Sequence, residues 1–456
     1  MTTTRVAGLL LLLAAATAAS AAAQTSLTIY NDGRVLVRRT VPLTVPKGRS
    51  TQHATLGPLD PASIFSLDST VTITGLAYDG AVDEASVLRR SVGRRLVFRL
   101  PESKDTVSAL VLGVDPLRLR LPDGRVAFSP PGAALYPGDV VVADPTASLT
   151  LESARAQDRL RLGYFTGGAS WRASYQVVLG TAAARVTGSA VLESQALRAE
   201  DAEVQLLAGA VGRAEPAGSP APYAARAAMA DMAMEKATAS EQRVGEFHLY
   251  SLPGRSTLLP GLTTSVALFD PADVKYERNY VVHGLVPWWG MLPQQGDETE
   301  APVEVVYTLK RPRKSDFGDR PLPGGIVRLF QPDSAGRAQL VGEAAMNHTP
   351  AGEDLRLSAG TAFDITARRV QTTYLTRRDS PRAGWRTVAT ADYRVTVRNA
   401  TDSAAAVDVQ EERAGEWAVV QSSVPAEKVS SIITRFRVKV PPRGETVLTY
   451  RVRVVW

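Results

Sequence analysis

The sequence predicts an all-β protein made of several antiparallel sandwiches, immunoglobulin-like in type, with a small inserted β-barrel. Three observations predict this class. Apolar and polar residues alternate along most of the chain, which is the period of a β-strand, and helical periodicity is scarce. Turn residues separate the alternating stretches at the spacing typical of a sandwich. The chain has 456 residues, too many for one hydrophobic core, so several domains are expected.

Residues 1–23 have the pattern of a secretory signal peptide. Arg5 precedes an apolar run from Val6 to Ala16, and Ala21-Ala22-Ala23 closes the segment with small residues. The apolar run is too short to cross a bilayer comfortably. We therefore expect cleavage near Ala23, export to the periplasm or cell envelope, and a mature chain without a transmembrane span.

Composition excludes several classes of protein. The chain contains no cysteine, which excludes disulfide scaffolds, thiolate metal sites, a cysteine nucleophile and a lipoprotein anchor. Its net charge is +6, carried mainly by arginine. Arg89-Arg90, Arg94-Arg95 and the run Arg311-Pro312-Arg313-Lys314 offer contacts to anionic polymers or lipid headgroups, although a solvated positive face is the simpler interpretation. No aromatic–basic motif indicates a nucleic-acid partner.

The N-terminal half divides into three predicted β regions. In the segment 24–90, Leu27 and Ile29 alternate as one strand, and the turn Asn31-Asp32-Gly33 leads into the next. Segment 91–144 has short strands joined by tight turns, which predicts the small β-barrel-like subdomain. Segment 145–213 has longer strands of a sandwich, with Trp171 and Tyr175 on the core face.

The C-terminal half begins with a break in the alternation. Residues 214–243 combine prolines with an alanine-rich tract that contains Met229, Met232 and Met234, which predicts a linker. Capture of Cu(I) by these thioethers is an alternative, but no Cys or His lies nearby. Segment 244–456 returns to strands and is predicted to be a C-terminal β-sandwich region. Its last strand places Leu448, Tyr450, Val452, Val454 and Trp456 on one face.

Several blocks together resemble one known family. They are Gly163-Tyr164-Phe165-Thr166-Gly167-Gly168-Ala169-Ser170-Trp171-Arg172-Ala173-Ser174-Tyr175, Glu246-Phe247-His248-Leu249-Tyr250 with Leu252-Pro253, Leu322-Pro323-Gly324-Gly325, Val341-Gly342-Glu343 with His348-Thr349-Pro350, Gly360-Thr361-Ala362-Phe363-Asp364, and Asn399. In this order the blocks resemble the bacterial domain of unknown function that forms the C-terminal half of mucoidy inhibitor A-like proteins. The resemblance runs from about Leu27 to Trp456.

The resemblance implies an exported or envelope-associated multi-domain β protein with a link to capsule or exopolysaccharide. No catalytic residue set is established for the family, so none is carried over. Longer members have a helical, coiled-coil-like region before the β portion. Nothing of that kind lies between Gln24 and Tyr164, so any function of that region is in doubt here.

The sequence predicts no catalytic, cofactor or metal site. The histidines at positions 53, 248, 283 and 348 lie far apart, and no His-Glu-x-x-His pair is present. Gly168-Ala169-Ser170-Trp171-Arg172 begins like a serine nucleophile elbow, but it lacks the second glycine and lies between two strands. Glycine-rich spots are followed by strands, so no helix N-terminus is offered to a phosphate.

One enzymatic alternative remains. Glu343, Glu353, Asp354 and Asp364 lie within twenty-two positions of one another, and two of them are able to act as a glycosidase pair if the fold sets them at the required separation. This alternative is a carboxylate-dependent hydrolase of an envelope glycan. The simpler interpretation is that these acids lie in turns and at strand ends.

The leading functional hypothesis is a non-enzymatic protein that binds an envelope or matrix component, either a polysaccharide or a protein partner. Trp288 and Trp289 are the candidate binding residues, because the proline-flanked loop from Pro287 to Pro293 has no regular period and tryptophan stacks on sugar rings or fills a partner's groove. Packing of these tryptophans on the end of a sandwich is the alternative. A third possibility is a structural subunit of an envelope assembly, with an exposed apolar patch or sheet edge.

Overall fold

The computed structural model describes residues 25–80, 82–101, 104–141, 144–209, 211–212, 240–284, 296, 298–379, 386–413 and 415–456. These residues are almost entirely strands, which confirms the predicted all-β class. None of the helices in this part of the chain is long and apolar enough to cross a membrane. The chain divides into two compact units, the first formed by residues 1–170, 194–205 and 254–262 and the second by the remainder.

The largest sheet has seven strands. In spatial order they are β16 (Ser240–Val244), β17 (Phe247–Leu258), β15 (Ala199–Ala208), β1 (Thr25–Tyr30), β2 (Val35–Val45), β12 (Gln157–Thr166) and β4 (Phe65–Ser66). The predicted hairpin of β1 and β2 is present, with Leu27 opposite Val37 and Gly33 at a positive φ of 83° in the turn. Leu160, Leu162 and Tyr164 of β12 are all buried, as their alternation predicts.

A three-stranded sheet completes the main body of the first unit. Its order is β3 (Gly48–Thr55), β11 (Thr146–Ser153) and β5 (Val71–Asp79), and both pairings are antiparallel. A short 3-10 turn, η1 (Pro61–Ser63), follows β3. Alternate residues of the central strand β11 are buried, namely Ala147, Leu149 and Leu151.

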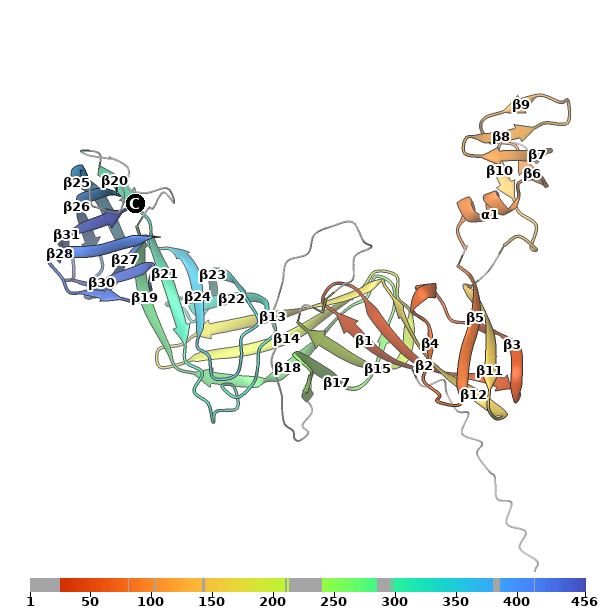
Figure 1. Ribbon diagram of the computed structural model, residues 1–456, viewed down its shortest axis with the longest axis horizontal. Coiled ribbons are helices and arrows are strands. Elements are labelled where there is room, and N and C mark those ends of the chain that lie inside the picture. The colour runs from red at the N-terminus through yellow and green to blue at the C-terminus, as the bar shows by residue number, and fades with distance from the viewer. Residues whose placement is uncertain are drawn as a thin grey trace, which may run out of the picture. The chain divides into compact units, whose positions relative to one another are not determined.

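A small sheet is inserted between β5 and β11 (Figure 1). Its order is β10 (Ala133–Leu135), β6 (Arg95–Arg99), β7 (Thr106–Val114), β8 (Leu117–Arg120) and β9 (Val126–Ala127). Helix α1 (Glu84–Arg90) precedes it, and the Asp83 carboxylate caps this helix by accepting from the Ser86 N–H at 2.9 Å. Leu96, Phe98, Ala109, Val111 and Leu119 form its own core. Because β10 and β9 do not pair among the described residues, the predicted barrel is corrected to an open sheet.

The second unit contains a five-stranded sheet that is partly parallel. Its order is β18 (Thr263–Val274), β14 (Ala184–Ser194), β13 (Ala169–Leu179), β22 (Gly325–Pro332) and β23 (Ala338–Met346). Trp171 and Tyr175 of β13 are buried, as predicted. The pairing of β13 with β22 is parallel, which the period of the sequence cannot reveal because parallel and antiparallel strands alternate alike.

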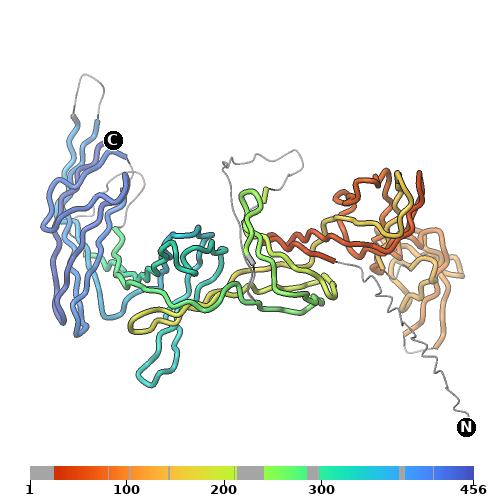
Figure 2. Tube along the Cα trace, turned by 90° about the horizontal axis from the view of Figure 1, so that it is seen from below, coloured from red at the N-terminus to blue at the C-terminus, as the bar shows by residue number. Residues whose placement is uncertain are grey.

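The C-terminal sandwich is made of two further sheets of the second unit (Figure 2). One has the order β24 (Leu355–Thr361), β21 (Val303–Leu309), β19 (Tyr276–His283), β27 (Ala405–Glu412), β30 (Ile433–Val440) and β29 (Ala426–Lys428). The other has the order β20 (Glu298–Ala301), β25 (Ile365–Asp379), β26 (Arg386–Asn399), β31 (Gly444–Val455) and β28 (Glu416–Ser422). The pairing of β19 with β27 is parallel.

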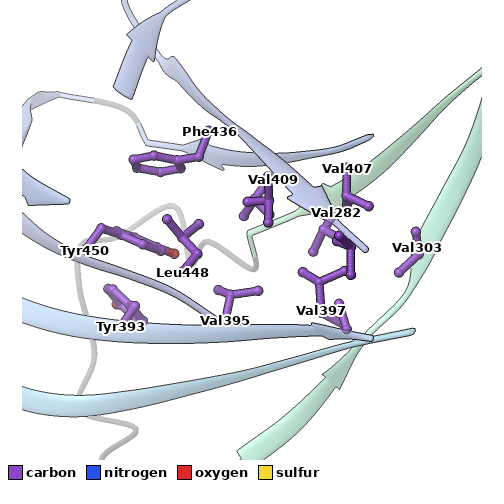
Figure 3. Close-up of a cluster of buried hydrophobic side chains, with 14 of the residues drawn as sticks. Val282, Val303, Tyr393, Val395, Val397, Val407, Val409, Phe436, Leu448 and Tyr450 are labelled. Carbon is purple, nitrogen blue, oxygen red and sulfur yellow. The ribbon is translucent and has the colours of Figure 1, made fainter. Parts of the chain in front are cut away.

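Figure 3 shows apolar side chains from both of these sheets meeting in one core. Val395 and Val397 of β26 and Val407 and Val409 of β27 are fully or almost fully buried. In β31, Leu448, Tyr450, Val452 and Val454 are buried as predicted. Trp456 is 51% exposed although its N–H and carbonyl both hydrogen-bond to Thr387, so the predicted apolar face is buried only as far as Val454.

A charged cluster is buried in the same sandwich. The Glu411 carboxylate accepts from the Arg369 guanidinium at 2.5 Å, from the Arg413 guanidinium at 3.2 Å and from the Tyr450 hydroxyl. Glu411 is completely inaccessible to solvent. Burial raises the pKa of Tyr450 well above its ordinary value, so this hydroxyl stays protonated and donates. Although burial disfavours a charged guanidinium, the Glu411 carboxylate raises the pKa of Arg369.

Candidate anion-binding site

A concave pocket in the first unit is lined mainly by polar and cationic side chains. Its volume is about 440 Å³, within the usual range of small-ligand sites. The lining residues are Thr25, Ser26, Arg38, Arg39, Thr40, Leu67, Arg161, Glu203, Gln205 and Arg255. Four of them are arginines and one is acidic, so cationic groups dominate the lining.

Strand register brings this lining together. Ser26 of β1 lies opposite Arg38 of β2, and Arg38 lies opposite Gly163 of β12. Residues directly opposite one another point to the same face of a sheet. Since Val35 and Val37 face the core, the next residue, Arg38, points to the other face. Thr40 and Arg161, which are also paired, lie on that face too.

Arg38 is held by neutral groups alone. Its Nη2 donates to Ser26 Oγ at 3.0 Å, to Thr28 Oγ1 at 3.0 Å and to Gln205 Oε1 at 2.7 Å. Within the described part of the chain, its Nε and Nη1 make no hydrogen bond and no carboxylate pairs with it. One side of the guanidinium is therefore fixed in place while its charge remains available to a ligand.

Two other arginines of the lining are positioned by carboxylates. Arg161 Nε pairs with Asp68 Oδ1 at 2.6 Å, and the Arg161 N–H donates to Asp68 Oδ2 at 2.8 Å. Burial alone would raise the pKa of Asp68, but the hydrogen bonds from Arg161 and Gln157 outweigh burial and lower this pKa. Arg255 pairs with Asp201 at 2.8 Å. These pairs neutralise Arg161 and Arg255, so among the described residues the uncompensated charges of the lining are those of Arg38 and Arg39.

Arg39 lies on the core face of β2, opposite Thr25 and Leu162. Its Nε is buried and has no hydrogen-bond partner among the described residues. The remaining polar groups of the lining are hydroxyls, the Gln205 amide and the exposed Glu203 carboxylate. Hydroxyl and amide side chains both donate and accept hydrogen bonds, which suits a ligand that carries hydroxyl groups beside its acidic group.

Trp288 and Trp289 lie outside the described residues. The last described residue before them, Gly284, donates its N–H to the Gln410 carbonyl at 2.7 Å. Gly296, which follows them, donates to the Gln371 carbonyl at 3.2 Å. Binding by these tryptophans stays a prediction. Met229, Met232 and Met234 lie outside the described residues, as does the predicted signal peptide. The last residues of the predicted linker, 240–243, are described and belong to strand β16, which pairs with β17, so the linker prediction is wrong at this end.

Two of the four carboxylates of the hydrolase alternative are paired with different cations. Glu343 pairs with Arg328 at 2.8 Å, whereas Asp354 pairs with Lys310 at 3.3 Å and accepts from the Arg311 N–H at 2.8 Å. All four are exposed or partly exposed, and among the described residues none contacts another of the set through its carboxylate. None of them lines the arginine pocket.

The four histidines belong to no group of metal-ligating side chains among the described residues. His53 contacts Ser148, while His248 and His283 each pair with one glutamate. His348 Nδ1 accepts from the Gly324 N–H at 3.0 Å, and burial and the nearby His248 lower the pKa of His348. No group of three or more metal-ligating side chains occurs in the described ranges.

The basic run at positions 311–314 is not a single exposed patch. Arg311 is completely buried. Its guanidinium donates to the backbone carbonyls of Pro350 and Glu353, each at 3.0 Å. It also donates to the carbonyls of Phe317 and Arg320. Its guanidinium also lies 5.2 Å from the centre of the Phe317 ring. Arg311 therefore holds two loops together, and the interpretation of this residue as part of a solvated positive face is wrong.

Sequence reasoning missed the arginine pocket. A signal was present, because the core-facing Val35 and Val37 place Arg38 on the opposite face of β2. Its partner Gln205, however, lies 167 positions away in sequence, and only strand order brings the two together. Comparisons of the chain with models of known families, with curated proteins and with solved structures found no match.

Proposed function

We propose that this protein is exported to the cell envelope and binds an acidic polysaccharide of the envelope or matrix through the Arg38 pocket, without catalysing a reaction. The observation that carries the proposal is the Arg38 guanidinium, which is fixed by three neutral acceptors and has no carboxylate partner among the described residues. Export rests on the predicted signal peptide.

A sugar acid suits the lining better than an isolated inorganic anion. The free Nε and Nη1 of the Arg38 guanidinium are each able to donate a charge-assisted hydrogen bond to a carboxylate. Thr25, Ser26, Thr40 and Gln205 offer hydroxyl and amide groups to the hydroxyls of a sugar ring. The exposed Glu203 carboxylate is able to accept from such hydroxyls, whereas it repels a multiply charged phosphate.

The resemblance to the C-terminal half of mucoidy inhibitor A-like proteins belongs to this proposal, since it implies a link to exopolysaccharide. The hydrolase alternative has no supporting contact among the described residues, because Glu343 and Asp354 are paired with different cations. Binding of a polymer, and not its cleavage, is therefore the function that we carry forward.

The first prediction concerns Arg38. Calorimetric titration with short oligogalacturonate chains, used as a probe, should detect binding by the wild type. Arg38→Gln should weaken this binding roughly ten- to hundredfold, the range for losing hydrogen bonds to a charged group. Arg38→Lys should fall between the two, because it keeps the charge but loses the planar fork.

Arg159→Gln is the matched control for this experiment. Arg159 is an exposed arginine on the same strand as Arg161, and it does not line the pocket. The Arg159→Gln variant should bind the oligogalacturonate probe with the affinity of the wild type. Equal affinities of the wild type and Arg38→Gln, with both proteins folded, would rule out the pocket as the binding site. Binding of phosphate but not of the sugar acid would retain an anion site and reject the polysaccharide.

A further inference from the structure

The inserted sheet has two chemically different faces. One face carries the buried side chains of Leu96, Phe98 and Leu119. The other face carries Arg95, Val97 and Arg99 of β6, because successive residues of a strand point to opposite faces. Arg118 and Arg120 flank Leu119 on β8 and lie on this second face too. We call it the basic face, and it is distinct from the Arg38 pocket.

Strand register aligns the basic face in rows. Arg95 lies opposite Leu110, Leu110 opposite Arg120, and Arg120 opposite Val126. Arg95 and Arg120 are therefore about 10 Å apart, two strand spacings. In the next row Val97 lies opposite Leu135. Cationic and apolar side chains thus alternate across the sheet.

The arginines of the basic face have no counter-charge. Arg95, Arg99, Arg118 and Arg120 are all exposed, and they make no ion pair or side-chain hydrogen bond within the described part of the chain. Other arginines of the same inserted segment are paired, since Arg94 contacts Asp139 at 2.6 Å and Arg125 contacts Asp123 at 2.5 Å. The described strand residues on the basic face include no acid.

Several large apolar side chains on and beside this face are exposed to solvent. Val97 is 39% exposed, Leu135 40% and Val126 44%. Phe128, two residues after Val126 and just beyond the end of β9, is 67% exposed. Scattered apolar residues are ordinary on a protein surface, but here Val97, Leu135 and Val126 lie among unpaired arginines on one face.

We propose that the basic face docks onto the surface of an anionic phospholipid bilayer. Each arginine near such a surface gains free energy from the negative headgroups. The apolar side chains enter the boundary between headgroups and acyl chains, as the apolar side of an interfacial helix does. A glycan would neutralise the arginines but would leave Val97, Leu135 and Phe128 in water, which is why charge and apolar exposure together favour a membrane.

Vesicle co-sedimentation of the full chain tests this proposal. Wild-type protein should sediment with vesicles that contain phosphatidylglycerol, should remain in solution with pure phosphatidylcholine vesicles, and should be released as salt is raised. Arg95→Gln with Arg120→Gln should lower the partition coefficient at least on the order of tenfold. Phe128→Ser should lower the partition coefficient further, without changing how vesicle binding depends on salt concentration.

The control makes the same change of charge elsewhere. Arg394→Gln with Arg398→Gln removes two exposed, unpaired arginines from β26 and should leave vesicle binding unchanged. Arg38→Gln should also bind vesicles normally, so failure of the pocket and failure of the basic face are separable. Unchanged binding of Arg95→Gln with Arg120→Gln would overturn the proposal. Retention on an immobilised acidic glycan, without vesicle binding, would show that the partner of the basic face is a glycan and not a membrane.

Discussion

Buried arginines occur at two places in the second unit, and they differ in what satisfies them. Arg311 donates to backbone carbonyls, so its charge is spread over neutral dipoles, and burial lowers its pKa. Arg369 and Arg413 share the single carboxylate of Glu411. Arg38 of the first unit has neutral partners as well, but it borders a pocket. The partners and the access to solvent thus separate the structural arginines from the arginine that we propose binds a ligand.

The second prediction follows from Glu411. Glu411→Gln should lower the free energy of unfolding by about 3–5 kcal/mol, because removing one partner of a buried ion pair leaves uncompensated charge, here on two guanidinium groups. Denaturant titration measures the difference. Glu445→Gln, an exposed glutamate at the start of β31, should change stability by less than about 0.5 kcal/mol. Equal stability of the two variants would mean that the cluster does not contribute to the sandwich.

A very short strand, β4, lies at one edge of the seven-stranded sheet. Strand β4 has two residues, yet it places Phe65 over Gly163, where a Cβ atom would meet the Phe65 ring. Just after β4, Asp68 forms an ion pair with Arg161, which lines the pocket. An edge strand too short to pair further protects the sheet from edge-to-edge association, and it also positions this ion pair.

The third prediction uses the pKa of Asp68. A carboxyl group whose pKa is lowered on folding stabilises the protein above its unfolded pKa, about 3.9, and this contribution is lost as the pH falls through the folded value. Asp68→Asn should therefore be less stable than the wild type at about pH 7, and the difference should shrink below about pH 4. Denaturation at several pH values measures it.

Asp158→Asn is the control for the pH experiment. Asp158 is exposed on β12, the strand that carries Arg161, and it contacts only its neighbour Arg159, at 3.4 Å, among the described residues. Its replacement should change the free energy of unfolding by less than about 0.5 kcal/mol. A constant difference for Asp68→Asn across the whole range would show that the ion pair is not the source of the effect.

At the scale of the whole molecule, the two proposed surfaces lie in the same unit and differ in kind. The Arg38 pocket is concave and polar, and two of its four guanidinium groups, those of Arg38 and Arg39, have no carboxylate partner among the described residues. The basic face is a sheet surface with four unpaired arginines and exposed apolar side chains. Binding of a polymer in the pocket and docking to a bilayer through the basic face are compatible in an envelope protein.

The fourth prediction concerns export. Small residues at Ala21 and Ala23 suit a signal peptidase, so protein recovered from the envelope fraction of a bacterial host should have the mass of a chain that begins at Gln24. Ala23→Asp should retain the precursor mass, because a charged residue does not fit the cleavage site. Ala22→Asp, at the tolerant middle position, should be processed normally. A wild-type protein that keeps Met1 would contradict export by this route.

Local alternation was enough to predict the all-β class, the hairpin at Gly33 and the core positions of Trp171, Tyr175 and Tyr450, because burial on one face of a strand imposes a period of two. The same period cannot distinguish a parallel from an antiparallel neighbour or a closed from an open sheet. It therefore missed the β13–β22 pairing and predicted a barrel where β6 lies in an open sheet.

The sequence by itself determined which faces of the strands are apolar, and that followed from residue order alone. Only the tertiary structure decided which charges are paired, since Arg38 and Gln205, or Arg369 and Glu411, meet through strand order across long separations. A charge becomes a binding group when the fold leaves it without a counter-charge at an accessible surface. That property depends on spatial neighbours, which residue order does not contain.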